Sequence, residues 1–168
     1  MQNNLPFIIP ENDINLRLSR FLLIIDILAY TQRGKLVLNI DKLIIFDFLV
    51  KNPYILKQVL KVKGKTKIKL YKEEIGSVAT LYPSKNAILD TNSSKILIKL
   101  MVLRKMVVVN KQSDELFFTL SDQGKALISE IKTDYIDRIK ELCESMLVLR
   151  SISTNELKKI INPLIKGV

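Results

Sequence analysis

The sequence predicts a mainly α-helical fold that contains one small β-hairpin, and three neighbouring features lead to this prediction. Lys95–Lys105 has the composition of an apolar helix. Two short β-prone runs, Met106–Val109 and Leu116–Leu120, flank the polar turn Asn110–Glu115 and indicate a hairpin. Ser121 then provides a typical helix N-cap. Helix, hairpin and capped helix in this order are typical of a winged helix-turn-helix domain. Some domains of this fold bind DNA, and others bind only proteins.

Length and composition predict a chain with a sizeable core and no membrane association. The 168 residues, 48% of them apolar, suit a winged-helix domain at about 1–150 with an inserted basic segment at about 62–93, and a C-terminal helix at 151–168. No signal peptide is recognisable, and the longest apolar run, Phe21–Tyr30, is far shorter than the roughly 20 residues of a membrane span. We therefore expect a cytoplasmic protein, with the lone Cys143 as a small core residue.

The residue types that most enzymes depend on are scarce. The chain has no His and a single Cys, so it lacks the commonest general base and the ligands of a structural zinc site. No phosphate-binding glycine loop and no nucleophile motif is present. The sequence therefore predicts a binding protein without catalytic activity, metal or cofactor.

The N-terminal part predicts a long apolar helix. Asn12 or Asp13 can cap a helix that runs to about Gln32. Its half Phe21–Tyr30 is apolar on nearly every face, which indicates burial all round. Two interpretations stay open: a central core helix, or a partner-binding surface that uses Phe21, Leu22 and Ile25.

A short strand and two helices are expected next. Leu36–Leu38 is the predicted strand, and Asn39 or Asp41 begins a helix through Lys51. Asn52-Pro53 then begins a short helix that ends near Lys61.

Basic residues concentrate in the middle third of the chain. Residues 51–111 carry 14 basic and 3 acidic side chains, which accounts for the whole net charge of +10. Lysines alternate along Lys61–Lys72 with a period of two, as on one face of an extended segment. Such a face can contact phosphates without reading sequence, or can be a solvated strand edge. The candidate nucleic-acid contacts are Lys61, Lys63, Lys65, Lys67, Lys69, Lys72 and Lys111.

The C-terminal part predicts one long helix from Ser121, followed by a short one. Apolar residues three or four positions apart approximate a coiled-coil seam. The seam consists of Ile128, Ile131, Tyr135, Ile139, Leu142, Met146 and Leu149. It binds a partner in one interpretation and packs on its own domain in the other. Ser153–Glu156 is a capping box that begins the last helix.

Three segments carry a family resemblance. LRLSRFLLIIDILAY (Leu16–Tyr30), LNIDKLIIFDFLVKNP (Leu38–Pro53) and FTLSDQGKAL (Phe118–Leu127) resemble the small middle component of bacterial ABC-three-component systems, which include the small subunit of Lamassu-type anti-phage defence. The resemblance implies a winged-helix adaptor that binds an SMC-like ATPase and an effector subunit. FTLSDQGKAL is also similar to the end of the wing in MarR-type regulators. The alternative function is therefore a homodimeric DNA-binding transcriptional regulator whose wing contacts phosphates.

Overall fold

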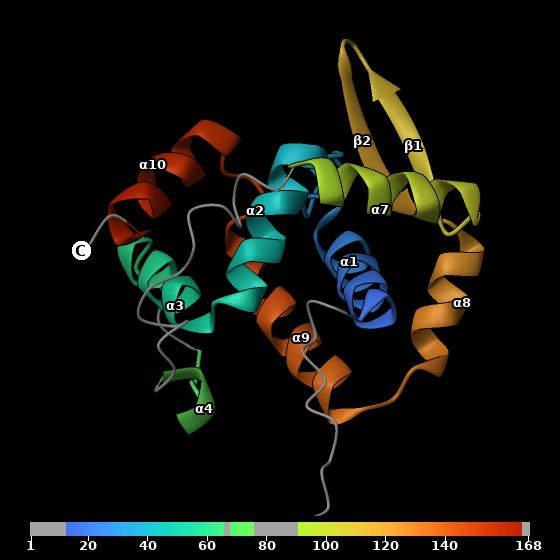
Figure 1. Ribbon diagram of the computed structural model, residues 1–168. Coiled ribbons are helices and arrows are strands. Elements are labelled where there is room, and N and C mark those ends of the chain that lie inside the picture. The colour runs from blue at the N-terminus through green and yellow to red at the C-terminus, as the bar shows by residue number, and fades with distance from the viewer. Residues whose placement is uncertain (1–12, 66–67, 76–90, 166–168) are drawn as a thin grey trace, which may run out of the picture.

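The computed structural model describes residues 13–65, 68–75 and 91–165, which form a mainly helical fold with one two-stranded antiparallel sheet (Figure 1). The helices are α1 (Ile14–Leu28), α2 (Ile40–Lys51), α3 (Pro53–Val62), α4 (Lys72–Ile75), α7 (Thr91–Leu103), α8 (Asp122–Glu130), α9 (Asp134–Ser145), the short 3-10 helix η1 (Met146–Val148) and α10 (Thr154–Ile165). The strands are β1 (Val107–Gln112) and β2 (Glu115–Leu120).

Helix α1 is the centre of the core. It contacts α2, α8, α9, η1 and β2, and Figure 1 shows α8 and α9 on different sides of it. Asp13 caps its first turn, accepting a hydrogen bond from the Asn15 amide at 2.8 Å. The helix ends four residues before the predicted Gln32, because the chain reverses at Gly34 (φ +76°) and the Thr31 amide bonds to Lys35 instead. The core-helix interpretation of this segment is confirmed.

The next two helices begin where their capping residues predict. The Asn39 side chain accepts a hydrogen bond from the Lys42 amide at 3.0 Å and begins α2, which is buried along most of its length. Pro53 occupies the first turn of α3. The side-chain amide of Asn52 does not cap this helix, because it donates a hydrogen bond back to the Phe48 carbonyl of α2.

The predicted hairpin is confirmed, although its turn is shorter than expected. Gln112 pairs with Glu115, so the turn is only Ser113 and Asp114, and Ser113 takes the left-handed conformation with φ 54°. The polar residues next to the turn belong to the strands, because this end of the hairpin lies in solvent. The predicted strand Leu36–Leu38 is reduced to isolated bridges and two hydrogen bonds, from the Val37 amide to the Ala29 carbonyl and from the Phe118 amide to the Leu38 carbonyl, both at 3.0 Å.

The single long helix expected after Ser121 is wrong. Helix α8 ends at Glu130, Ile131 is extended, and Thr133 begins α9 by accepting a hydrogen bond from the Ile136 amide at 3.2 Å. The break lets the two helices, which both contact α1, lie on different sides of it (Figure 1). A straight helix would reach only one of them.

Helix α10 packs on α3 and contributes Leu157 and Ile161 to the cluster of buried apolar residues. Its start follows the predicted cap, because the Ser153 hydroxyl accepts a hydrogen bond from the Glu156 amide at 3.2 Å.

Candidate partner-docking surface

Helix α7 and the hairpin are joined by a tight, polar junction. Lys105 reverses the chain with a positive φ of 57°. The Ser121 hydroxyl donates to the Lys105 carbonyl at 2.6 Å, and the same oxygen accepts from the Gly124 amide at 3.1 Å, capping α8. The Ser121 amide donates to the Met106 carbonyl at 3.0 Å. One serine therefore fixes the end of α7, the base of the hairpin and the start of α8.

Gly124 allows α8 to approach this junction closely. A Cβ atom at this position would lie 2.3 Å from the Met106 carbonyl oxygen. That distance is far inside van der Waals contact, and the obstacle is backbone, which cannot rotate away. The glycine of the FTLSDQGKAL segment is therefore explained by packing.

An apolar groove lies between α7 and one face of the hairpin. Val109 pairs with Phe118, and Leu116 lies two residues before Phe118, so all three share that face. The groove has a volume of about 540 Å³, within the range of clefts that bind ligands. Its walls, almost wholly apolar, are formed by Ile40, Lys95, Ile98, Lys99, Val102, Leu103, Val109, Leu116 and Phe118.

Several of the apolar side chains that line the groove are exposed to solvent. Leu103 is 79% exposed, and Val109 and Leu116 are about half exposed. Ile96, on the same helix, is also exposed. Contiguous exposed apolar surface of this kind marks an interaction site more often than an isolated exposed leucine does.

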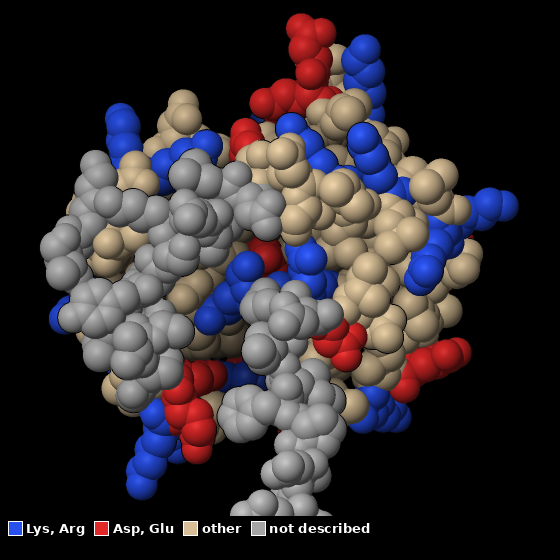
Figure 2. All heavy atoms as spheres, in the orientation of Figure 1, with Lys and Arg blue, Asp and Glu red and all other residues tan. Residues whose placement is uncertain are grey.

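The α7 side of the groove is basic. Lys95, Lys99, Arg104 and Lys105 are exposed, and residues 91–105 contain no Asp or Glu. Figure 2 shows Lys and Arg side chains beside the tan surface in the region of α7 and the hairpin base. Acidic side chains gather instead at the far end of the hairpin, where Asp114 and Glu115 lie.

The partner-binding residues predicted from sequence lie in or against the core rather than on an exposed stripe. Phe21, Leu22 and Ile25 of α1 are fully buried, and the seam residues Ile139, Leu142, Met146 and Leu149 are buried as well. Ile128, Ile131 and Tyr135 are partly buried and pack against the same cluster. Of the two interpretations of the seam, packing on the chain's own domain agrees with the structure, and its period of three and four reflects two helices that face the same core.

The predicted nucleic-acid residues do not share one extended face. Lys61 belongs to the last turn of α3, and the chain turns at Gly64 with a positive φ of 69°. Lys63 forms an ion pair with Glu156 of α10 at 2.5 Å. The remaining described lysines of the set, Lys65, Lys69, Lys72 and Lys111, are exposed, and Lys67 lies outside the described residues. The prediction of one extended lysine face over Lys61–Lys72 is therefore wrong for its first residues, which are helical up to Val62 and turn at Gly64.

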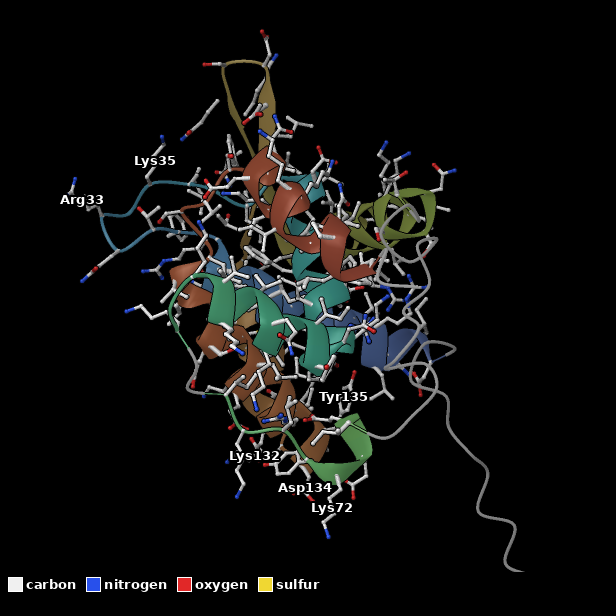
Figure 3. The ribbon with its side chains drawn as sticks, turned by 90° about the vertical axis from the view of Figure 1, so that its left-hand side faces the viewer. Arg33, Lys35, Lys72, Lys132, Asp134 and Tyr135 are labelled. Carbon is white, nitrogen blue, oxygen red and sulfur yellow. The ribbon has the colours of Figure 1, made fainter. Side chains whose placement is uncertain are left out.

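Basic side chains of the set and outside it lie at different ends of the molecule. Figure 3 shows Lys72 at the lower end of the molecule, and Arg33 and Lys35 on the turn at another end. No single converging cluster of cations is formed by these labelled residues.

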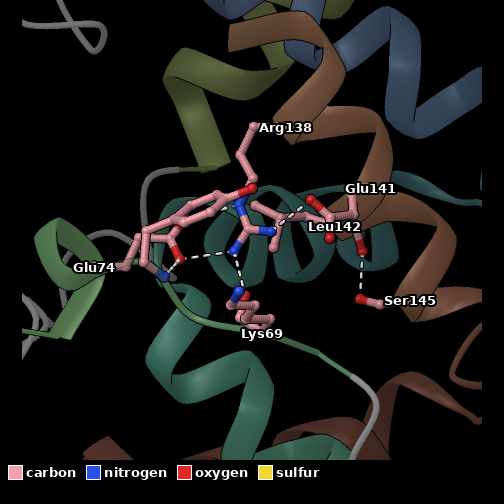
Figure 4. Close-up of polar contacts among 7 residues, drawn as sticks. Lys69, Glu74, Arg138, Glu141, Leu142 and Ser145 are labelled. Carbon is pink, nitrogen blue, oxygen red and sulfur yellow. Dashed lines mark hydrogen bonds and ion pairs between the residues drawn. The ribbon is translucent and has the colours of Figure 1, made fainter. Parts of the chain in front are cut away.

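Arg138 of α9 anchors the second half of the lysine-rich segment (Figure 4). Its guanidinium makes a two-pronged ion pair with Glu74 of α4, at 2.9 and 2.7 Å, and donates to the Lys69 carbonyl at 2.9 Å. It also bonds Glu141 at 2.7 Å and stacks over the Tyr71 ring at 4.4 Å. Burial lowers the pKa of Arg138, but the hydrogen bonds and charges of Glu74 and Glu141 outweigh burial, and the pKa is raised. Sequence reasoning missed this cluster, whose partners are 64 residues apart.

The described residues offer no assembled metal or thiol chemistry. They contain no group of three or more His, Cys, Asp or Glu side chains placed to hold a metal ion. Cys143 is fully buried, and burial raises the pKa of its thiol. A neutral, enclosed thiol is a core residue in physical terms.

Comparison with known families decides what kind of protein carries this surface. Residues 28–159 match the family described as ABC-three component (ABC-3C) system Middle Component 4. The chain belongs to this middle component family. A middle component of a three-component system has other subunits as partners, so an accessory subunit of a multi-component system is the function that membership supports. No curated protein and no solved structure matches the chain. Across the described part of the middle component, none of the helices is long and apolar enough to cross a membrane.

Proposed function

We propose that this middle component is a non-enzymatic winged-helix adaptor that joins an SMC-like ATPase to an effector subunit in a cytoplasmic anti-phage defence complex. The winged-helix assignment is supported by the order of elements: α1, a bridging segment at residues 36–39, α2, then α7, the hairpin and α8. Helices α3 and α4 fall between α2 and α7, so on this assignment the inserted part begins earlier than the expected residue 62 and ends before α7 begins at Thr91.

The apolar groove is the single observation that carries the adaptor function. In a DNA-reading winged helix, the helix before the wing presents polar side chains to base edges. Here that helix is α7, whose solvent-facing side includes Ile96 and Leu103, at 67% and 79% exposed, and Leu103 lines the groove. Apolar side chains at this place favour a protein partner over a DNA groove.

The regulator alternative loses its main support. The apolar seam that could join two copies of a regulator is not exposed, because Ile139 and Leu142 are buried in the chain's own core. No other described feature favours a homodimer over a complex with different subunits.

Reconstitution tests the adaptor function. The ATPase and effector encoded with this chain are purified separately, then mixed with and without it and analysed by size-exclusion chromatography with light scattering. The proposal requires a ternary complex that forms only when the middle component is present. An ATPase–effector complex that assembles equally well without the chain, or a middle component that joins neither subunit, contradicts the proposal. Nanomolar binding of the isolated chain to a specific DNA operator would favour the regulator instead.

A further inference from the structure

We infer that the groove between α7 and the hairpin binds an acidic amphipathic helix of a partner subunit. This inference rests on the proposed adaptor function and names the chemistry of its ligand. Three observations carry it: the nearly complete absence of polar atoms from the groove walls, the exposure of Leu103, Val109 and Leu116, and the lysines along one rim.

The apolar walls favour a helix over an extended segment. A bound segment needs its backbone N–H and C=O groups satisfied once water is removed. The groove walls provide almost no hydrogen-bonding groups for them. An α-helix forms its backbone hydrogen bonds internally, so it can place an apolar stripe into such a groove without leaving polar groups unpaired.

The charges select an acidic ligand. Lys95 and Lys99 lie one helical turn apart on α7 and line the groove, and Arg104 and Lys105 follow at the end of the helix. Carboxylates beside the apolar stripe of the ligand would meet these cations at the rim. A second copy of this chain fits poorly at α7 itself, because residues 91–105 of that copy would add four more positive charges and no negative ones.

The same cations do not make the groove a DNA site. A phosphate backbone needs donors where it docks, whereas the groove floor consists of aliphatic and aromatic side chains such as Ile98 and Phe118. Placing phosphates against that floor would remove their hydration without replacing it. DNA is therefore an outcome that the experiment must be able to detect, and we do not propose it as the ligand.

Binding of partner-derived peptides to the full-length chain tests the inference. The probes are fluorescent peptides of about twenty residues that cover the acidic amphipathic helices of the ATPase and effector encoded with the chain. We expect at least one to bind saturably by fluorescence anisotropy. Leu103→Glu should weaken that peptide by at least about tenfold, as truncation of a central apolar side chain does at interfaces. Val62→Glu, at another exposed apolar position, is the matched control and should leave binding unchanged.

A charge exchange separates specific contact from general attraction. Lys95→Glu with Lys99→Glu should weaken the peptide by at least about tenfold, while Lys158→Glu with Lys159→Glu changes the net charge equally on exposed positions of α10 and should have little effect. A peptide with its acidic residues changed to Lys should regain binding to the Lys95/Lys99 variant. This arm does not depend on how well the Leu103 variant folds.

The outcomes distinguish the groove from the adaptor function. The inference is overturned if the two lysine-pair variants weaken peptide binding equally, or if no peptide binds saturably. It is also overturned if duplex DNA displaces the peptide and Leu103→Glu weakens the binding of DNA and of peptide equally. A ternary complex that survives Leu103→Glu and the Lys95/Lys99 exchange overturns the groove as docking site but leaves the adaptor function standing. Failure of the unmodified chain to join either subunit overturns the adaptor function itself.

Discussion

The Arg20 guanidinium of α1 and the Asp47 carboxylate of α2 form an ion pair inside the core, with Nε 2.5 Å from Oδ1. The two side chains are only 1% and 8% exposed. Lys51 also approaches Asp47, at 3.2 Å, and the Tyr135 hydroxyl of α9 lies 3.4 Å from Arg20. The pair therefore connects the central helix to two of the helices that cover it.

Removing one member of this pair should destabilise the fold strongly. In Asp47→Asn the buried Arg20 guanidinium loses its contact with the Asp47 carboxylate, and we expect a loss of about 3–5 kcal/mol in the free energy of unfolding, measured by urea denaturation. Asp26→Asn, on the exposed side of α1, is the control and should change stability by less than about 0.5 kcal/mol. Similar losses of stability in the two variants would show that the buried ion pair stabilises the fold no more than an exposed side chain does.

Gly124→Ala should destabilise the protein although alanine favours helices. Helix propensity alone would make the variant about 1 kcal/mol more stable. The added Cβ, however, meets the Met106 carbonyl oxygen at 2.3 Å, and relieving that overlap should cost more, leaving a net loss of about 1–3 kcal/mol. Thermal denaturation followed by circular dichroism measures the loss, with the exposed neighbour Gln123→Ala as control. A more stable Gly124 variant would contradict the close packing of α8.

Arg138→Lys should loosen residues 68–75 while the rest of the fold persists. Lysine keeps the charge but cannot make the two-pronged contact with Glu74 or donate at the same time to the Lys69 carbonyl. Hydrogen exchange by mass spectrometry should show faster exchange in this segment only. Arg104→Lys, at an exposed position on another element, should leave exchange there unchanged. Unaltered exchange in the Arg138 variant would mean that other contacts hold the segment.

Lys42 should make stability depend on pH in the alkaline range. Burial lowers the pKa of this lysine from its usual 10.5, with Lys35 adding to the shift and Glu115 opposing it. Between the lowered pKa and 10.5 the unfolded chain binds more protons than the folded chain, so the contribution of this group to stability rises with pH.

The comparison of Lys42→Met with the unmodified chain measures that contribution. The stability of the unmodified protein relative to the variant, measured by urea denaturation at each pH, should increase as the pH rises from below the lowered pKa of Lys42 toward 10.5. Lys42 also donates a hydrogen bond to the Arg150 carbonyl at 2.8 Å. Its loss in Lys42→Met adds a difference in stability between the two proteins at every pH. Lys125→Met, at an exposed position, should show no such trend. A difference that falls with pH has the wrong sign for a lowered pKa.

Any DNA binding by the chain should be weak, independent of sequence and carried by exposed lysines of the middle third. Changing Lys61, Lys65, Lys69 and Lys72 to Gln should reduce the slope of log K against log salt by about 0.9 for each phosphate that is no longer neutralised. The matched control changes four exposed lysines elsewhere to Gln: Lys125, Lys140, Lys158 and Lys159. Equal slopes for the two quartets would mean that the lysine-rich segment is only a solvated surface.

Local signals correctly predicted where several helices begin. Asp13, Asn39, Ser121 and Ser153 each accept a backbone hydrogen bond in the first turn of the helix that they precede. Capping depends on a few consecutive residues, so a sequence contains all the information needed to find it. The hairpin was predictable for the same reason, because its strands are close in sequence.

Features set by distant contacts were not predictable. The apolar spacing continues through the break at residues 131–133, because α8 and α9 both face α1, and the only local sign of the break is Thr133 as an N-cap. The Arg138 cluster joins segments that no local pattern connects. The sequence shows that α7 is apolar. Which of its apolar side chains are buried and which line the exposed groove depends on where the hairpin lies, and the sequence does not show that.

The enclosure of α1 has a consequence for how the protein is made. This helix leaves the ribosome early, whereas α8 and α9, which cover it, begin only at Asp122 and Asp134. At roughly 5–20 residues per second, synthesis of the intervening hundred or so residues takes about 5–20 seconds. During that interval Phe21, Leu22 and Ile25 lack the neighbours that enclose them in the finished fold. The nascent chain therefore leaves the α8 and α9 sides of this apolar helix uncovered until the C-terminal third emerges, which is longer than in a protein whose core is built from adjacent segments.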